Sequence, residues 1–288
     1  MLQPEEFATR GDVLRRAVSM MGHAGIDDAR LDAELMLAAA CGVSRAALLT
    51  GVVEPDTAAI ERFEAMLLRR VVREPLAYII GRREFYSMEF AVTPEVLIPR
   101  PETELLVDQA LEFIARKPEG CVLDIGTGSG AIAIAIAANA PGARIVATDV
   151  SENSLAIARA NAMTHRCADR IEFVRTDLFP PRTDAFDVIL SNPPYVPSRD
   201  IDSLAPEVRL YEPRHALDGG EDGLDFYRKI IPDCRRYLAP DGVVAFEVGM
   251  DQADGVAAMF THAGFRNVTA FNDLSAIPRV VRASGLDF

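Results

Sequence analysis

From residue 121 onward, short apolar runs alternate with segments of helical periodicity, and this alternation restricts the fold more than any other feature. Continuous apolar runs of strand length between helices predict a mostly parallel sheet covered by helices on both faces. Two final runs have only a short connection between them, so we expect an antiparallel last pair and a seven-stranded, Rossmann-like α/β domain. The runs lie at 121–125, 144–148, 171–175, 186–191, 243–248, 266–271 and 279–283, and the helical segments lie near 130–139, 152–163, 223–238 and 252–263.

Residues 10–75 show helical periodicity throughout. Asp27 and Asp56 stand where they can cap helices. An apolar stripe at helical spacing usually means only that helices pack on one another, so we predict a small all-helical domain without site residues of its own. One such stripe consists of Ile60, Phe63, Leu67 and Val71.

The segment between the two regions has a β-like pattern. The stretches 84–92 and 96–98 flank Thr93-Pro94-Glu95, and this predicts a short hairpin that turns at these three residues. The predicted boundaries are 1–83 for the helical domain, 84–100 for the hairpin linker and 101–288 for the α/β domain.

A glycine-rich turn joins the first apolar run to the helix that follows it. Its residues are Gly126, Thr127, Gly128, Ser129 and Gly130. Glycines let a backbone turn tightly and approach a ligand where a Cβ would collide. Asp149 ends the next run, 19 residues beyond the last of these glycines, where a carboxylate can accept both hydroxyls of an adenosine ribose. The two features together predict a nucleoside cofactor.

The identity of that cofactor depends on a second acidic residue. The spacing of Gly126, Gly128 and Ala131 also satisfies the dinucleotide fingerprint, and a glycine-rich turn can be purely structural. Asp124 lies two residues before the first glycine. A carboxylate there is unfavourable beside a pyrophosphate but favourable near the methionyl amine and sulfonium cations of S-adenosyl-L-methionine. This position favours S-adenosyl-L-methionine over NAD, with S-adenosyl-L-homocysteine as the product.

The tetrapeptide Asn192-Pro193-Pro194-Tyr195 follows the apolar run 186–191, at a strand end where open α/β sheets bind ligands. The lone pair of an amide or aromatic amine nitrogen is delocalised, so such a nitrogen is a poor nucleophile. Two acceptors aimed at its N–H bonds can localise the lone pair. The Asn192 side-chain carbonyl and the Pro193 backbone carbonyl are candidate acceptors, on a backbone that two prolines stiffen.

The same tetrapeptide has a plain alternative, because Asn-Pro commonly opens a turn. The glycine-rich turn and Asp149 at the correct spacings favour methyl transfer to a planar nitrogen instead. Tyr195 would pack on the planar substrate group. No strong general base is needed, since the nitrogen becomes acidic once methylated, and most of the acceleration would come from alignment of nitrogen, methyl carbon and sulfur.

Composition restricts which partners and cofactors the protein is expected to bind. The net charge is −13, of which −2 falls on residues 1–85 and −11 on the remainder, which disfavours direct nucleic-acid binding. The four cysteines and four histidines are scattered, so we expect neither disulfides nor a metal site. No apolar window is long enough to span a membrane, and residues 1–6 lack the order of a secretory signal, so we expect a cytoplasmic protein.

At these residues the sequence resembles the HemK/PrmC family, the N(5)-glutamine methyltransferases that modify the Gly-Gly-Gln motif of peptide chain release factors. The resemblance covers nearly the full length. Besides the turn and the tetrapeptide it includes the stretches 81–86, 97–104, 176–179, 212–213 and 218–224.

The resemblance implies roles for single residues. Gly126 to Gly130 and Asp149 would hold the cofactor, with Asp177 and Leu178 near the adenine. Asn192 would touch both cofactor and substrate, and Pro193, Pro194 and Tyr195 would complete a glutamine pocket. It also implies that the run Ile98–Glu104 covers the cofactor, although a rigid, proline-bracketed start of a helix explains that run equally well. Release factors would dock on the helical domain of a monomeric enzyme.

Three other enzymatic functions share parts of this pattern, and a binding module without activity is a fourth alternative. A sister enzyme that methylates a ribosomal large-subunit protein shares the tetrapeptide but resembles residues 99–104 less. A DNA exocyclic-amine methyltransferase also uses Asn-Pro-Pro-Tyr, but the acidic α/β part and the absence of a basic stripe disfavour it. An NAD-dependent oxidoreductase fits the glycine spacing without offering a hydride-relay histidine, and a binding module without activity leaves the tetrapeptide unexplained.

Overall fold

The computed structural model describes residues 9–181 and 185–286, so residues 1–6, on which the expectation about a signal rests, lie outside it. The chain forms two compact units. The helical unit contains the described residues up to Arg82 together with Ala205–Tyr211, and the α/β unit contains Arg83–Leu204 and the described residues from Glu212 onward. Over the described residues, no helix is both long and apolar enough to cross a membrane.

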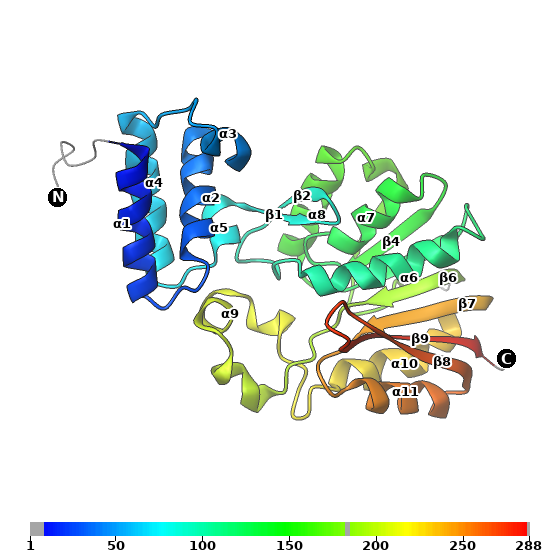
Figure 1. The fold of residues 1–288 in the computed structure, drawn as a ribbon. Helices are drawn as coiled ribbons and strands as arrows, with labels where there is room; N and C mark the ends of the chain where they lie inside the picture. Colours follow the sequence, from blue (N-terminus) through cyan, green and yellow to red (C-terminus); the bar gives the residue numbers. More distant parts are fainter. Residues whose placement is uncertain (1–8, 182–184, 287–288) are drawn as a thin grey trace. The chain divides into compact units, whose positions relative to one another are not determined.

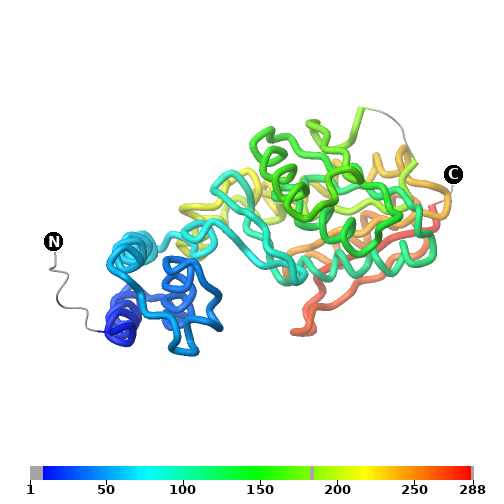
Figure 2. Tube along the Cα trace, turned by 90° about the horizontal axis from the view of Figure 1, so that it is seen from above, coloured from blue at the N-terminus to red at the C-terminus, as the bar shows by residue number. Residues whose placement is uncertain are grey.

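The helical unit confirms the periodicity of residues 10–75. Helices α1, α2 and α4 lie side by side in both views (Figures 1 and 2). Their facing sides bury Met21, Met36, Leu37 and Phe63 with at most 1% of each side chain exposed. The helices of this unit are α1 (Arg10–His23), α2 (Ala29–Cys41), α3 (Arg45–Leu49), α4 (Thr57–Val71) and α5 (Leu76–Ile80).

One of the two predicted caps is confirmed. Asp56 precedes α4 with extended backbone, and its carboxylate accepts from the Ala59 N–H at 2.7 Å. The prediction for Asp27 is wrong, because Asp28 occupies the N-cap position of α2. Asp28 has a ψ of 30°, outside the extended region, so its side chain makes no capping hydrogen bond.

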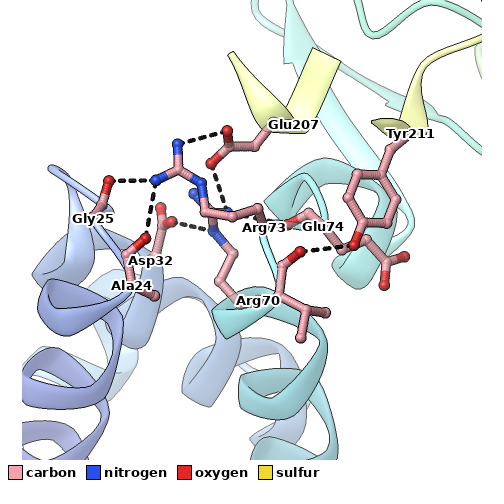
Figure 3. A network of polar contacts seen from close by, with 9 residues as sticks. Ala24, Gly25, Asp32, Arg70, Arg73, Glu74, Glu207 and Tyr211 are labelled. Atoms are coloured by element: carbon pink, nitrogen blue, oxygen red, sulfur yellow. Dashed lines mark hydrogen bonds and ion pairs between the residues drawn. The ribbon is translucent and has the colours of Figure 1, made fainter. Parts of the chain in front are cut away.

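A segment distant in sequence completes the helical unit. Helix α9 (Pro206–Tyr211) belongs to this unit although the residues on both sides of Ala205–Tyr211 belong to the other. The Tyr211 hydroxyl donates to the Val72 carbonyl at 2.8 Å, just beyond α4 (Figure 3). The chain therefore leaves the α/β unit soon after the Asn-Pro-Pro-Tyr tetrapeptide and returns seven residues later.

Four charged side chains hold α9 in place, and we call them the α9 network: Asp32, Arg70, Arg73 and Glu207. Arg70 donates to Asp32 Oδ2 at 2.7 Å and to Glu207 Oε1 at 3.0 Å (Figure 3). Arg73 donates to Glu207 Oε2 at 2.7 Å. Burial alone would raise the pKa of Glu207, but these two arginines hold it below its ordinary value.

The predicted hairpin exists, but its turn is elsewhere. Strands β1 (Arg82–Phe85) and β2 (Met88–Ala91) pair around Tyr86 and Ser87, not around residues 93–95. Both turn residues have positive φ, 51° and 58°. Glycine and asparagine usually mark such turns in a sequence, so the turn chemistry of Thr93-Pro94-Glu95 was the stronger signal.

The α/β unit contains the predicted seven-stranded sheet, in the order β5-β4-β3-β6-β7-β9-β8. Strands β3 to β7 are parallel, and β9 is antiparallel to both β7 and β8, as expected for the last pair. The strands are β3 (Cys121–Ile125), β4 (Arg144–Asp149), β5 (Ile171–Arg175), β6 (Phe186–Ser191), β7 (Leu238–Glu247), β8 (Phe265–Asn272) and β9 (Pro278–Leu286).

Helices cover both faces of this sheet (Figure 1), and alternate residues of one strand enter different cores. Val122 and Val188 pack with α6, α7 and α8, whereas Leu123 and Ile189 pack with α10 and α11. Burial on both faces explains why these strands are continuous apolar runs. The helices are α6 (Glu104–Ile114), α7 (Ala131–Asn139), α8 (Glu152–Thr164), α10 (Asp225–Tyr237) and α11 (Ala253–His262).

Candidate active site

A cavity of about 300 Å³ lies at the carboxyl ends of β3, β4 and β6. The last residues of these strands, Ile125, Asp149 and Ser191, form part of its wall. The chain adds β4 on one side of β3 and later β6 on the other, so the cavity lies where open α/β sheets bind ligands.

The glycine-rich turn forms one wall of the cavity through Gly126 and Gly128. Both have positive φ, 74° and 55°, and a Cβ on either would enter open space. Gly130 has a φ of 82° and a different reason to be glycine, because its Cβ would lie 2.9 Å from Ile134 Cδ1. Thr127 and Ser129 are buried behind the wall.

Asp149 ends β4, at the position predicted from the sequence. Its Oδ2 accepts from the Gly128 N–H and its Oδ1 from the Ser151 N–H, both at 2.9 Å. These bonds orient the carboxylate toward the cavity it lines and leave further lone pairs for donors such as ribose hydroxyls.

Asp124 is fully buried beneath the turn and is not part of the cavity wall. Its Oδ2 accepts from the Thr127 hydroxyl at 2.7 Å, but its Oδ1 has no partner among the described residues. Burial raises the pKa of Asp124 to about 7, although the Thr127 hydrogen bond opposes the shift. A nearby cation would restore its charge.

Asp177 and Leu178, which the resemblance implied to lie near the adenine, line the cavity beyond β5. Leu178 has a φ of 69°, uncommon for a branched side chain. The Thr148 hydroxyl donates to its carbonyl at 2.7 Å and so ties this backbone to the end of β4.

The tetrapeptide divides between the cavity and the core. Asn192, Pro193 and Pro194 line the cavity. Tyr195 does not line the cavity. Its hydroxyl points to Glu247 Oε1 at 3.4 Å, and its ring packs against the core that contains α10 and α11. Asn192 Oδ1 is buried without a hydrogen-bond partner among the described residues.

The stretch 218–224 supports the tetrapeptide from behind. A Cβ on Gly219 would lie 2.8 Å from the Pro194 carbonyl oxygen, and one on Gly223 would lie 2.3 Å from the Tyr195 carbonyl oxygen. Only glycine permits this approach of two backbones. The glycines that carried part of the resemblance therefore have a structural reason.

Sequence reasoning missed much of the cavity wall. Glu95, Val96 and Leu97 line it, whereas residues 98–104 do not. These later residues form a 3₁₀ turn, Pro101–Thr103, that leads into α6, which confirms the start of a helix. Phe226 and Lys229 also line the cavity, and their spacing of three on the predicted helix 223–238 was the available signal.

A seven-stranded sheet of this order, with a nucleoside-sized cavity beside its glycine-rich turn, defines a class I S-adenosylmethionine-dependent methyltransferase. Solved structures agree with the fold. The catalytic domain of hMettl16, in complex with an RNA hairpin, matches with a TM-score of 0.57 and 19% identity over 80% of this chain and 82% of that one. The N-terminal domain of human METTL16, in complex with S-adenosylhomocysteine, matches with a TM-score of 0.51 and 17% identity, covering 80% and 83%.

Sequence comparisons identify the family. The family model described as Methyltransferase small domain matches residues 102–221, and the PrmC N-terminal domain matches residues 12–81. The release factor glutamine methyltransferase of Geobacter sulfurreducens is 43% identical over 98% of both chains, and that of Caulobacter vibrioides is 43% identical over 90% of both. The chain belongs to the release factor glutamine methyltransferase family.

Proposed function

We propose that this protein transfers a methyl group from S-adenosyl-L-methionine to the side-chain amide nitrogen of the glutamine in the Gly-Gly-Gln motif of peptide chain release factors. One observation carries the proposal: Asn192 lines the cavity just after β6, and its buried Oδ1 has no hydrogen-bond partner among the described residues. A substrate N–H would supply the missing donor. The names of the relatives support glutamine as the source of that N–H.

The residues around the cavity suit the cofactor. Gly126 and Gly128 leave open space where side chains would stand, and Asp149 offers lone pairs to a ribose. Asp124 has an unpartnered carboxylate oxygen beneath the same turn, and a cationic ligand would compensate its burial. We assign these residues, with Asp177 and Leu178, to cofactor binding.

The protein's part in the reaction is positioning. When bound, S-adenosyl-L-methionine supplies an electrophilic methyl group. Asn192 Oδ1 and the Pro193 carbonyl would each accept one N–H of the glutamine amide, which holds the nitrogen lone pair toward the methyl group. Pro193 and Pro194 limit the backbone freedom of these acceptors. Tyr195 would join the substrate pocket only by a change from its present position toward Glu247.

The direct test is to incubate the protein with labelled S-adenosyl-L-methionine and an intact release factor and to map the modified peptide by mass spectrometry. The expected product is one methyl group on the glutamine of the Gly-Gly-Gln motif. Label in a ribosomal large-subunit protein or in duplex DNA, with release factor unmodified, would replace this proposal by one of its rivals. A Gln→Asn variant of the release factor is the matched control.

We further propose that the release factor docks on the helical unit. We also propose that the enzyme is a monomer and acts in the cytoplasm. Leu68 and Val72 are 63% and 61% exposed, one turn apart at the end of α4. Changing both to serine should raise KM for the intact release factor while leaving the affinity for S-adenosylhomocysteine unchanged. Met163→Ser, at a residue 71% exposed in the α/β unit, is the control, and equal KM values would refute this docking surface. Light scattering tests the monomer.

A further inference from the structure

The side chain of Asn192 is held from behind, on the side away from the cavity. Its Nδ2 donates to the Thr103 hydroxyl oxygen at 3.1 Å. Thr103 is 4% exposed and ends the 3₁₀ turn Pro101–Thr103. The amide oxygen of Asn192 has no such partner among the described residues.

Glu247 lies behind Thr103, at the end of β7. It is 2% exposed, and its carboxyl group interacts with the Thr103 hydroxyl and with the Tyr195 hydroxyl. The Tyr227 hydroxyl donates to the Glu247 backbone carbonyl at 2.7 Å and fixes the strand end. We call Thr103, Asn192, Tyr195 and Glu247 the Asn192 network.

The donor and acceptor roles of the groups in this network favour one of the two orientations of the Asn192 amide. A threonine hydroxyl has a single hydrogen, and an ionised carboxylate can only accept. When Thr103 donates to Glu247, its oxygen must accept from Asn192, and only Nδ2 can donate. The reversed amide would place Oδ1 against an oxygen without a free hydrogen. The penalty for such a pair corresponds to a preference of roughly tenfold to a hundredfold.

We propose that Thr103 and Glu247 are positioning residues, which turn Asn192 so that Oδ1 faces the substrate nitrogen. The inference rests on the proposed function, since it assumes that Oδ1 receives the glutamine N–H. It also assigns a task to the run Ile98–Glu104, whose members do not line the cavity.

The backbone that carries Thr103 is itself anchored. Glu212 accepts from the Ile98 N–H at 3.2 Å and forms an ion pair with Arg100. Arg100 also donates to the Ile98 carbonyl at 3.0 Å. A proline at the first position of the 3₁₀ turn stiffens it further. These contacts hold the Thr103 hydroxyl at a constant place behind Asn192.

The network should depend on pH. Burial raises the pKa of Glu247 to about 7, while Thr103 and Arg279 oppose the shift and Glu102 adds to it. Glu102 and Thr103 act on Glu247 from η2 (Pro101–Thr103), and Arg279 acts from β9. The hydroxyls of Tyr195, in the tetrapeptide, and Tyr227, on α10, also interact with it.

The direction of the pH dependence of kcat follows from the protonation state of Glu247. The ionised carboxylate, which predominates above pH 7, can only accept, so it attracts the Thr103 hydrogen and favours the Asn192 orientation in which Nδ2 faces Thr103. Below pH 7 the protonated carboxyl can itself donate to Thr103, whose hydrogen is then free to turn to Asn192 and to permit the reversed amide. We therefore expect kcat to fall as the pH drops through about 7.

The test compares Thr103→Val, Thr103→Ser and Glu247→Gln with the wild-type protein, using an intact release factor at saturating S-adenosyl-L-methionine. Thr103→Val keeps the shape but removes the hydroxyl, so kcat should fall by roughly tenfold to a hundredfold with an unchanged affinity for S-adenosylhomocysteine. Thr103→Ser should restore kcat to within about threefold of wild type. Glu247→Gln, whose side chain does not titrate, should lose the acid limb of the kcat profile.

Val256→Ala is the control for lost stability, because Val256 is fully buried on α11 and its apolar side chain makes none of the hydrogen bonds of the Asn192 network. It should lower the melting temperature without lowering kcat. Equal kcat for wild type and Thr103→Val, or an acid limb that persists in Glu247→Gln, would overturn the inference. A wild-type protein that binds S-adenosylhomocysteine but methylates no release factor would instead overturn the proposed function.

Discussion

The two units each contain a buried polar cluster, and the clusters differ in which atoms lack partners. In the α9 network both oxygens of Glu207 are paired with arginines (Figure 3). In the α/β unit, three side-chain oxygens are buried without partners among the described residues: Asn192 Oδ1, Asp124 Oδ1 beneath the glycine-rich turn, and Glu247 Oε2 behind Thr103. The other such side-chain atoms among the described residues are nitrogens, Nε of Arg73 and Nε of Arg83. The unpartnered buried oxygens among the described residues therefore all belong to the α/β unit, and two of them belong to residues that we assign to the cofactor or the substrate.

This difference has an energetic meaning. A buried acceptor without a donor destabilises a fold by about 1–3 kcal/mol, so such atoms persist where a ligand needs them. A charged pair that has lost one member is worse, because the other charge stays buried. Substitutions in the cavity should thus affect function more than stability, and substitutions in the α9 network should do the reverse.

The largest expected effect is that of Asn192→Ala. The variant loses the acceptor for the substrate N–H, and kcat should fall by about a hundredfold to a thousandfold. Stability should change by less than about 1 kcal/mol, since the lost bond to Thr103 is offset by removal of an unpartnered oxygen. Single-turnover assays and thermal melts measure the two quantities. A large loss of stability with activity retained would break the comparison between the clusters.

Asp149 extends the comparison, because its carboxylate lines the cavity although each of its oxygens already accepts one backbone N–H. Asp149→Asn replaces one acceptor by a donor that faces a backbone N–H. We expect the dissociation constant for S-adenosylhomocysteine to rise by about tenfold to a hundredfold, as for loss of a charged hydrogen bond. Calorimetric titration measures it. Asp254→Asn, at an exposed residue of α11, is the control and should bind normally.

Glu207→Gln tests the opposite side of the comparison. Loss of the charge leaves Arg70 with Asp32 as its ion-pair partner and gives Arg73 an uncharged amide in place of a carboxylate, so the helical unit should lose about 2 kcal/mol of stability. Because the pKa of Glu207 is lowered in the folded state, its contribution is present above the ordinary glutamate pKa and is lost as pH falls through the folded value.

Thermal melts at pH 7 should therefore separate Glu207→Gln from wild type by several degrees, and the difference should shrink in acid. Glu61→Gln, at an exposed residue of α4, should melt like wild type. The affinity for S-adenosylhomocysteine should be the same in all three proteins. Equal melting of Glu207→Gln and wild type would show that the α9 network contributes little to the fold.

Much of the α/β unit could be predicted from sequence because its strands are buried on both faces. The pattern that results from this burial placed β3 and β6, and the residues just after a strand, such as Asn192, follow once the strand is known. The turn at Tyr86 and Ser87 could not be predicted in this way, since neither residue is of the kind that usually adopts positive φ.

Contacts between residues distant in sequence could not be predicted either. The run that contains Glu247 reads as an ordinary strand, and nothing in its sequence shows that its carboxyl group meets Thr103, more than a hundred residues earlier. The ion pairs of Glu207 with Arg70 and Arg73 cannot be predicted from the sequence either, because they depend on tertiary packing rather than on local propensity. Charged residues predict networks poorly because most of them are simply solvated.

The smallest expected effect concerns protons at Asp124. In the free protein the pKa of Asp124 is raised to about 7 by burial, so the carboxyl group is largely protonated at pH 6 and ionised at pH 8. A bound cation stabilises the ionised form and lowers that pKa. Binding of S-adenosyl-L-methionine should then release up to about one proton at pH 6 and almost none at pH 8, and affinity should rise with pH between these values.

Titration calorimetry in two buffers of different ionisation enthalpy measures this proton release. Asp124→Asn keeps the hydrogen bond from Thr127 but cannot titrate, so its proton release at pH 6 should be lower than that of wild type by the share that Asp124 supplies. Equal proton release in both proteins would mean that Asp124 does not sense the cofactor's charge. Its unpartnered oxygen would then belong with the unpartnered Arg73 nitrogen, as a tolerated feature of packing rather than part of a binding site.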